Sequence, residues 1–261
     1  MRFEALLAGL ALAVLLPGDD ARAQKPVDVE LVLAVDVSQS MDRGEHELQR
    51  EGYVAALLHP QVLSAIRSGI YGRVAITYVE WGATQTVMTP WALIDDAATA
   101  RGFAKALASE PIRTIHGTSI SGALAFAASL FEANDYDGFR QVIDVSGDGP
   151  NSAGAPVVPI RDAVLEQGLI INGLPIMLRQ PAYTFYSIPD LDIYYADCVI
   201  GGPGSFVLPV DDASQLADAI RQKLVLEIAG APPRLSLAQA LRAPRIDCLI
   251  GEKLRGRWQN P

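Results

Sequence analysis

Five residues with oxygen-bearing side chains fall at three places where a strand ends or a helix begins. They are Asp36, Ser38, Ser40, Thr118 and Asp148. Their two carboxylates and three hydroxyls are hard oxygen donors, which suit Mg²⁺ or Mn²⁺. Ser38 and Ser40 stand two residues apart, so both hydroxyls can face one ion in a turn. The pattern therefore predicts a divalent-metal site.

A plainer interpretation exists for each cluster taken alone. Asp and Ser side chains cap helices routinely, so Asp36, Ser38 and Ser40 also fit a helix cap with a turn. Thr118 fits a helix N-cap as well, a role compatible with metal binding. The presence of Asp148 beyond a third element favours the metal site over caps alone.

Strands and helices are expected to alternate along the chain. Strands are predicted at residues 29–35, 73–81, 85–93, 141–146, 169–177 and 205–210, and helices at 44–58, 95–108, 118–131, 157–167, 190–200 and 211–228. This order predicts a doubly wound α/β fold: a mostly parallel sheet with helices on both faces. Pro90 confines its strand to an edge of the sheet, because proline has no backbone N–H to donate to a neighbouring strand. We expect this edge strand to be antiparallel. Such folds bind ligands at the carboxyl ends of their strands, where the oxygen donors fall.

Three motifs in order resemble those of the von Willebrand factor type A (VWA) domain. They are D-x-S-x-S at 36–40, G-T-S at 117–119 and S-G-D-G at 146–149. The resemblance covers residues 27–229 and implies a metal-ion-dependent adhesion site (MIDAS) at Asp36, Ser38, Ser40, Thr118 and Asp148. In that family the hydroxyls coordinate Mg²⁺ or Mn²⁺ directly, and an acidic group of a protein partner often completes the shell. Ser146-Gly147 departs from the common family pattern. The chain also looks like an uncharacterised bacterial exported branch of that superfamily.

The first 23 residues have the organisation of a secretory signal peptide. Arg2 precedes an apolar run at 6–16, and Ala21-Arg22-Ala23 provides a cleavage signature. The run is shorter than the roughly 20 residues that a spanning helix needs. We therefore expect cleavage near Ala23, a periplasmic or secreted protein, and no stable membrane insertion after cleavage. An uncleaved N-terminal anchor is the alternative.

Cys198 and Cys248 are the two cysteines of the chain. In an oxidising compartment one disulfide is the simplest interpretation, and two buried thiols are the alternative. A disulfide would tie the basic tail, expected at residues 230–261, to the domain. That tail then either covers the domain or extends from it.

Composition and motifs argue against several functional classes. A net charge of -9 disfavours nucleic acid. Residues 117–121 lack the last glycine of a nucleophile elbow, and residues 147–152 lack the third glycine of a dinucleotide fingerprint. We therefore expect a binding module with a protein partner, not an enzyme. Two alternatives stay open: a metal-dependent hydrolase, and a structural envelope scaffold with the metal as a staple.

Four further features of the sequence lead to structural predictions. Asp144, inside a strand, is expected to pair with a buried donor, and Asp42 to be a first-turn helix charge. His116 is expected at the surface rather than at the rim of the site. The aromatic segment 183–195 either contacts a partner or covers the sheet edge.

Overall fold

A five-stranded sheet forms the centre of the molecule, with strand order β3-β2-β1-β4-β5. The computed structural model describes residues 24–178, 187–230 and 245–259. The strands are β1 (Lys25–Asp36), β2 (Val74–Trp81), β3 (Gln85–Ile94), β4 (Tyr136–Gly147) and β5 (Ile170–Pro175). All neighbouring pairs are parallel except β2 and β3. The expected α/β fold with one antiparallel edge strand is confirmed.

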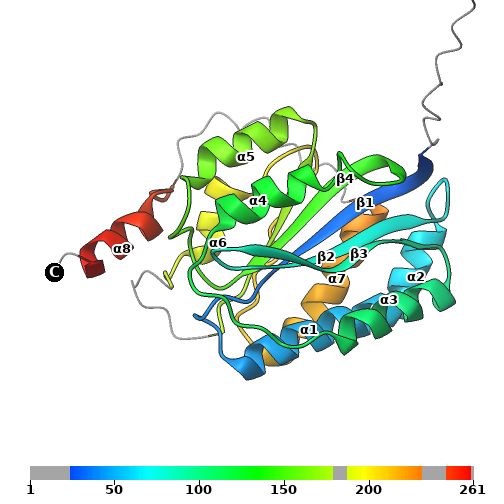
Figure 1. Ribbon diagram of the computed structural model, residues 1–261, viewed down its shortest axis with the longest axis horizontal. Helices are drawn as coiled ribbons and strands as arrows, with labels where there is room; N and C mark the ends of the chain where they lie inside the picture. Colours follow the sequence, from blue (N-terminus) through cyan, green and yellow to red (C-terminus); the bar gives the residue numbers. More distant parts are fainter. Residues whose placement is uncertain (1–23, 179–186, 231–244, 260–261) are drawn as a thin grey trace, which may run out of the picture.

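Helices cover both faces of this sheet (Figure 1). One face carries α1 (Arg43–Leu58), α2 (Pro60–Arg67), α3 (Ala97–Ser109) and α7 (Leu216–Ala229); the other carries α4 (Ile120–Ser129), α5 (Val157–Glu166) and α6 (Leu191–Tyr194). A π-helical turn (Tyr195–Val199) follows α6, a 3-10 turn (Ala213–Gln215) precedes α7, and α8 (Ile250–Gln259) lies near the C-terminus. The sequence patterns predicted neither α2 nor α8. None of the helices in the described ranges is long and apolar enough to cross a membrane.

β1 is continuously apolar because the helices bury both of its faces. Leu31 and Leu33 belong to the core under α1 and α7, whereas Val32 and Ala34 belong to the core under α4. None of the four is exposed to solvent. A central strand buried on both sides has no polar face, which explains the apolar run in the sequence.

Two prolines shape the edges of the sheet. Pro90 lies in edge strand β3, where the register shifts between the pairs Ile76–Ala92 and Tyr78–Thr89. Pro209 lies in the segment 205–210, and the prediction of a strand there is wrong. That segment makes two single bridges, at Val207 and Val210, instead of a ladder. Proline has no backbone N–H to donate, so it interrupts regular pairing.

Asp144 on β4 forms a buried charge cluster with Lys223 and Glu227 of α7. Lys223 Nζ donates to Glu227 Oε1 at 2.6 Å and forms an ion pair with Asp144. The expectation of a buried donor for Asp144 is confirmed. All three residues are at most 1% exposed, and two carboxyl groups share one ammonium. Burial and the neighbouring Asp144 raise the pKa of Glu227 to about 8, so the cluster retains a proton at neutral pH.

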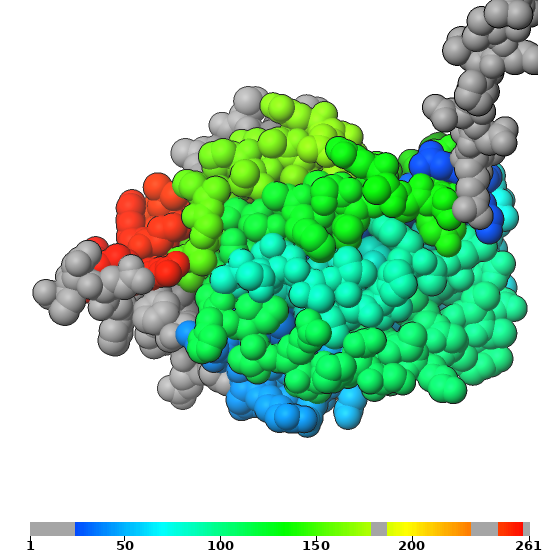
Figure 2. Space-filling view, viewed as in Figure 1, coloured from blue at the N-terminus to red at the C-terminus, as the bar shows by residue number. Residues whose placement is uncertain are grey.

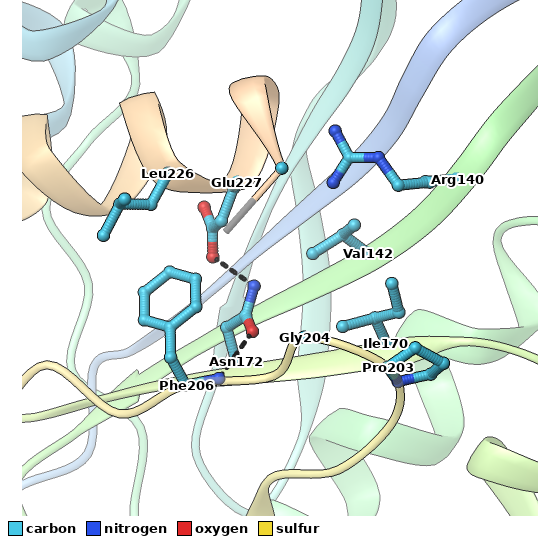
Figure 3. Close-up of a pocket in the computed structure, with 10 residues that line it drawn as sticks. Arg140, Val142, Ile170, Asn172, Pro203, Gly204, Phe206, Leu226 and Glu227 are labelled. Carbon is cyan, nitrogen blue, oxygen red and sulfur yellow. Dashed lines mark hydrogen bonds between the residues drawn. The ribbon is translucent and has the colours of Figure 1, made fainter. Parts of the chain in front are cut away.

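A small pocket opens beside Glu227, between β4, β5 and the end of α7 (Figure 3). Asn172 Nδ2 donates to Glu227 Oε1 at 3.2 Å, and Asn172 Oδ1 accepts from the Phe206 amide at 3.1 Å. The Arg140 guanidinium, at the pocket wall, donates to the Ile228 carbonyl at 2.7 Å. Arg140 belongs to the amino half of β4, so this pocket is separate from the predicted metal site.

The variant Glu227→Gln tests whether Glu227 carries the proton of the charge cluster. The folded-state pKa of Glu227 lies above the ordinary value of 4.5, so its contribution to stability is present at low pH and is lost as pH rises through about 8. One proton limits the slope to about 1.4 kcal/mol per pH unit. We expect the variant to show a smaller decline in unfolding free energy than wild type between about pH 6 and pH 9, by urea denaturation. Glu51→Gln, at an exposed position of α1, should keep the wild-type slope. Equal slopes in Glu227→Gln and wild type would contradict the assignment.

Candidate functional site

Two neighbouring strands bring the predicted ligands to one edge of the sheet. β1 ends at Asp36 and β4 ends at Gly147, and the two strands pair in parallel up to Val35 and Ser146. Asp148 directly follows β4. The carboxyl ends of β1 and β4 lie on the left in Figure 1, and their parallel pairing brings Asp36 close to Asp148.

Asp36 is held rigidly and is fully buried. The Ser38 amide donates to Asp36 Oδ1 at 2.7 Å, and Gln49 Nε2 of α1 donates to the Asp36 carbonyl at 2.9 Å. The second carboxylate oxygen, Oδ2, is buried and has no hydrogen-bond partner. A buried acceptor without a partner is costly, so this oxygen is suited to a ligand.

The two serines connect Asp36 to Asp148. Ser38 Oγ lies 2.8 Å from Ser40 Oγ, and Ser40 Oγ donates to Asp148 Oδ1 at 2.6 Å. Ser38 is fully buried and Ser40 nearly so. A continuous group of oxygen atoms thus runs from the end of β1 to the loop after β4.

The loop before α4 brings Thr118 to the same edge. Ile115 in this loop pairs with Ser38 through a parallel bridge, and the Thr118 carbonyl accepts from the amides of Ser152 and Ala153 at 2.9 and 3.0 Å. Thr118 itself is buried. The N-cap of α4 is Ser119, whose Oγ accepts from the Gly122 amide. Thr118 is therefore not the cap of this helix.

Two acidic side chains, Asp36 and Asp148, influence each other at this edge. Burial raises the pKa of Asp36 well above its usual range, the nearby Asp148 raises it further, and hydrogen bonds from Ser38 lower it. Within the described residues, no group of three or more His, Cys, Asp and Glu side chains is arranged to hold a metal. The donors here are instead two carboxylates with hydroxyls, a set that fits a hard divalent ion.

Gly147 and Tyr195 lie against Asp36, and the sequence did not predict that Tyr195 reaches the site. A Cβ atom at position 147 would lie 2.8 Å from Asp36 Oδ2, 2.8 Å from Tyr195 Oη and 3.1 Å from Trp81 Cζ2. The Tyr195 hydroxyl is buried and, like Asp36 Oδ2, has no hydrogen-bond partner. Glycine before Asp148 was visible as a departure from the family pattern, whereas nothing in the sequence linked Tyr195 to Asp36.

Other residues considered in the sequence take structural roles. Asp42 is the N-cap of α1, and its side chain accepts from the Glu45 amide. His116 is exposed, and its ring contacts Gln39. Trp81 is fully buried and packs in the core under α4. Of the aromatic segment 183–195, residues 183–186 lie outside the described residues.

Cys198 and Cys248 form a disulfide, with their Cα atoms 5.6 Å apart. Cys198 belongs to the π-helical turn after α6, the same turn that carries Tyr195. The disulfide therefore joins the C-terminal segment to the element behind the candidate site.

One protein family, described as "Protein of unknown function (DUF1194)", matches residues 26–232. The chain belongs to this family. No curated protein sequence is similar enough to the chain to count as a relative.

Solved structures establish the fold of this DUF1194 chain. Proximal thread matrix protein 1 from the mussel byssus, solved with a zinc-occupied MIDAS motif, has a TM-score of 0.58 at 14% identity over 79% of this chain and 49% of its own. The pilus adhesin SpaC of Lactobacillus rhamnosus GG has a TM-score of 0.58 at 14% identity, over 78% of this chain and 31% of its own. A von Willebrand factor type A protein of Catenulispora acidiphila has a TM-score of 0.52 at 15% identity, over 77% of this chain and 43% of its own. The chain spans less than half the length of each, and the shared part is the VWA fold.

Gly147→Ala tests the close packing around Asp36. The added Cβ would lie 2.8 Å from atoms of two fully buried side chains, Asp36 and Tyr195. We expect a loss of about 1–3 kcal/mol in unfolding free energy, measured by urea denaturation with EDTA present. Gly102→Ala is the matched control, because nothing lies within 4 Å of a Cβ at this position of α3. It should stabilise the helix by about 0.5–1 kcal/mol. Equal stabilities of the two variants would contradict this packing.

Proposed function

We propose that this chain is an exported binding module that holds Mg²⁺ or Mn²⁺ at Asp36, Ser38, Ser40, Thr118 and Asp148. The observation that carries the proposal is Asp36 Oδ2, a buried carboxylate oxygen without a hydrogen-bond partner. A second carboxylate, Asp148, is linked to Asp36 through Ser40 and Ser38: the Ser40 hydroxyl donates to Asp148, the two serine hydroxyls are in contact, and the Ser38 amide donates to Asp36 Oδ1. A divalent cation would offset the repulsion between the carboxylates and give the buried oxygen a partner.

The arrangement of side chains supports binding over catalysis. Asp36 is fully buried, so its carboxylate is poorly accessible as a nucleophile. The Ser40 hydroxyl donates to a carboxylate, Asp148, whereas a serine nucleophile is activated by a base such as histidine. A bound divalent ion supplies Lewis acidity and open positions for outside oxygen ligands. We propose that a protein partner fills such a position with an acidic group. The mussel protein, which shares the fold, has a MIDAS motif occupied by zinc, and this supports a metal at the site.

Export is part of the proposal and is supported by the predicted signal peptide and by the disulfide. The predicted signal peptide, residues 1–23, lies outside the described residues. The Cys198–Cys248 disulfide supports an oxidising compartment such as the periplasm or the cell exterior, because disulfides are rare in the cytosol.

Metal binding is tested by thermal and chemical unfolding of EDTA-treated protein. Metal at about 100 times its dissociation constant should add about 2.7 kcal/mol to the free energy of unfolding. Asp148→Asn should abolish this gain, because it removes one of the two carboxylates. Asp137→Asn is the matched control, an exposed position at the start of β4, the strand that Asp148 follows. If wild type gains no stability from Mg²⁺ or Mn²⁺, the metal site does not exist.

Partner capture is tested on the exported fraction of the cells that produce the protein. We expect immobilised wild type to retain a partner in Mg²⁺ and to release it in EDTA, whereas Asp148→Asn retains none. Converting the carboxyl groups of the released partner to amides should prevent its recapture, because the acidic group is the proposed contact. Retention that is equal in Mg²⁺ and in EDTA would rule out metal-mediated capture.

A further inference from the structure

The C-terminal arm, residues 245–259, packs against the edge of the domain that carries the candidate metal site (Figures 1 and 2). It lies beyond residue 232, where the family match ends. Two links fasten its start: the Cys198–Cys248 disulfide, and Arg245, whose amide donates to Asp197 at 2.6 Å and whose guanidinium pairs with the same carboxylate at 2.8 Å.

Helix α8 of this arm contacts the loop that follows Asp148. Glu252 Oε1 accepts from Asn151 Nδ2 at 2.7 Å, and the Arg255 guanidinium donates to the Ser152 carbonyl at 2.8 Å. Gly251 sits directly against the Asn151 carbonyl, where a Cβ atom would collide with it. Helix α8 therefore contacts two consecutive residues of this loop, Asn151 and Ser152.

Asn151 also forms hydrogen bonds with the surrounding elements. It is fully buried, and its Oδ1 accepts from the Ser121 amide of α4 at 3.0 Å. Its own amide donates to Tyr194 Oη at 3.1 Å, and its Nδ2 also donates to the Ala155 carbonyl at 3.0 Å. One asparagine thus fixes the loop after β4 to α4, to α6 and to α8.

Asn151 and Ser152 lie next to two of the predicted metal ligands, Asp148 and Thr118. Asn151 is three positions after Asp148 in the sequence. Ser152, held by Arg255, donates its amide to the Thr118 carbonyl at 2.9 Å. Movement of this loop would therefore displace Asp148 and Thr118 together, because Asp148 is joined to it by a short backbone segment and Thr118 by the hydrogen bonds from the Ser152 and Ala153 amides.

We propose that the C-terminal arm positions the metal site: Asn151 and Glu252 are positioning residues that hold the Asp148 loop, and the disulfide keeps α8 in place. The inference rests on the proposed metal-binding function, which it deepens. The arm supplies no ligand. It reduces the freedom of the loop, so less ordering is needed when the ion binds.

The first test uses metal-free protein and measures amide hydrogen exchange at Ser121, Ser152 and Ala153. Glu252→Ala removes the acceptor for Asn151 and should speed exchange at these amides about tenfold, the change that corresponds to about 1.4 kcal/mol of local opening. Glu252→Gln keeps an acceptor oxygen and should restore slow exchange. Unchanged exchange in Glu252→Ala would overturn the proposal.

A matched pair of arginine variants separates contact from charge. Arg255→Ala removes the bond to Ser152, whereas Arg257→Ala removes an exposed arginine two positions further along the same helix. Exchange at Ser152 and Ala153 should accelerate in the first variant only. Equal acceleration in both would show that net charge, not contact, governs the loop.

The second test measures the dissociation constant for Mn²⁺ by electron paramagnetic resonance of the free ion. Glu252→Ala and Arg255→Ala should bind about tenfold more weakly than wild type, and Glu252→Gln and Arg257→Ala within about twofold of it. The Cys198→Ser/Cys248→Ser double variant should resemble Glu252→Ala; if it does not fold, the single variants decide.

The outcomes distinguish the two claims. Wild type that binds no Mn²⁺ contradicts the proposed function, whatever the exchange data show. Wild type that binds Mn²⁺, with variants that exchange faster but bind equally well, overturns the positioning role and leaves the metal site standing. Faster exchange together with weaker binding supports the arm as a positioning element.

Discussion

The parallel pairing of β1 with β4 is the constraint on which the candidate site depends. It runs from Lys25 to Val35 on one strand and from Tyr136 to Ser146 on the other. Because parallel strands end at the same edge, this register brings residues more than 100 positions apart, Asp36 and Asp148, into one hydrogen-bonded group. A shift of one residue would turn Asp36 toward the opposite face and separate the two carboxylates.

Two buried carboxyl groups on these strands have different environments. Asp144 faces α7, where Lys223 supplies a positive charge. Asp36 lies at the strand end, and in the described part of the chain it has hydrogen bonds from amide groups but no ion pair with lysine or arginine. Among the described residues, Asp144 therefore has a cationic partner and Asp36 has none. This difference is the physical reason for assigning a structural role to Asp144 and a ligand-binding role to Asp36.

The sequence predicted what depends on local pattern and on topology. Alternating apolar runs and helices were sufficient to predict the sheet, and strand ends were sufficient to bring Asp36, Ser38 and Asp148 together. Contacts made through distant packing were not predictable. Tyr195 reaches the site from a π-helical turn, and Glu252 contacts Asn151 across 101 positions of sequence. Pro209 could have been read as a strand breaker, which would have prevented the wrong strand at 205–210.

The proposed function requires that one divalent ion is surrounded by Asp36, Ser38, Ser40, Thr118 and Asp148. A crystal structure of the protein grown with Mn²⁺, with anomalous diffraction recorded near the manganese edge, tests it most directly. We expect one strong anomalous peak between the ends of β1 and β4, within direct coordination distance of the Ser38 and Ser40 hydroxyls. An ordered site with no peak at this edge, or a peak held by other residues, would contradict it.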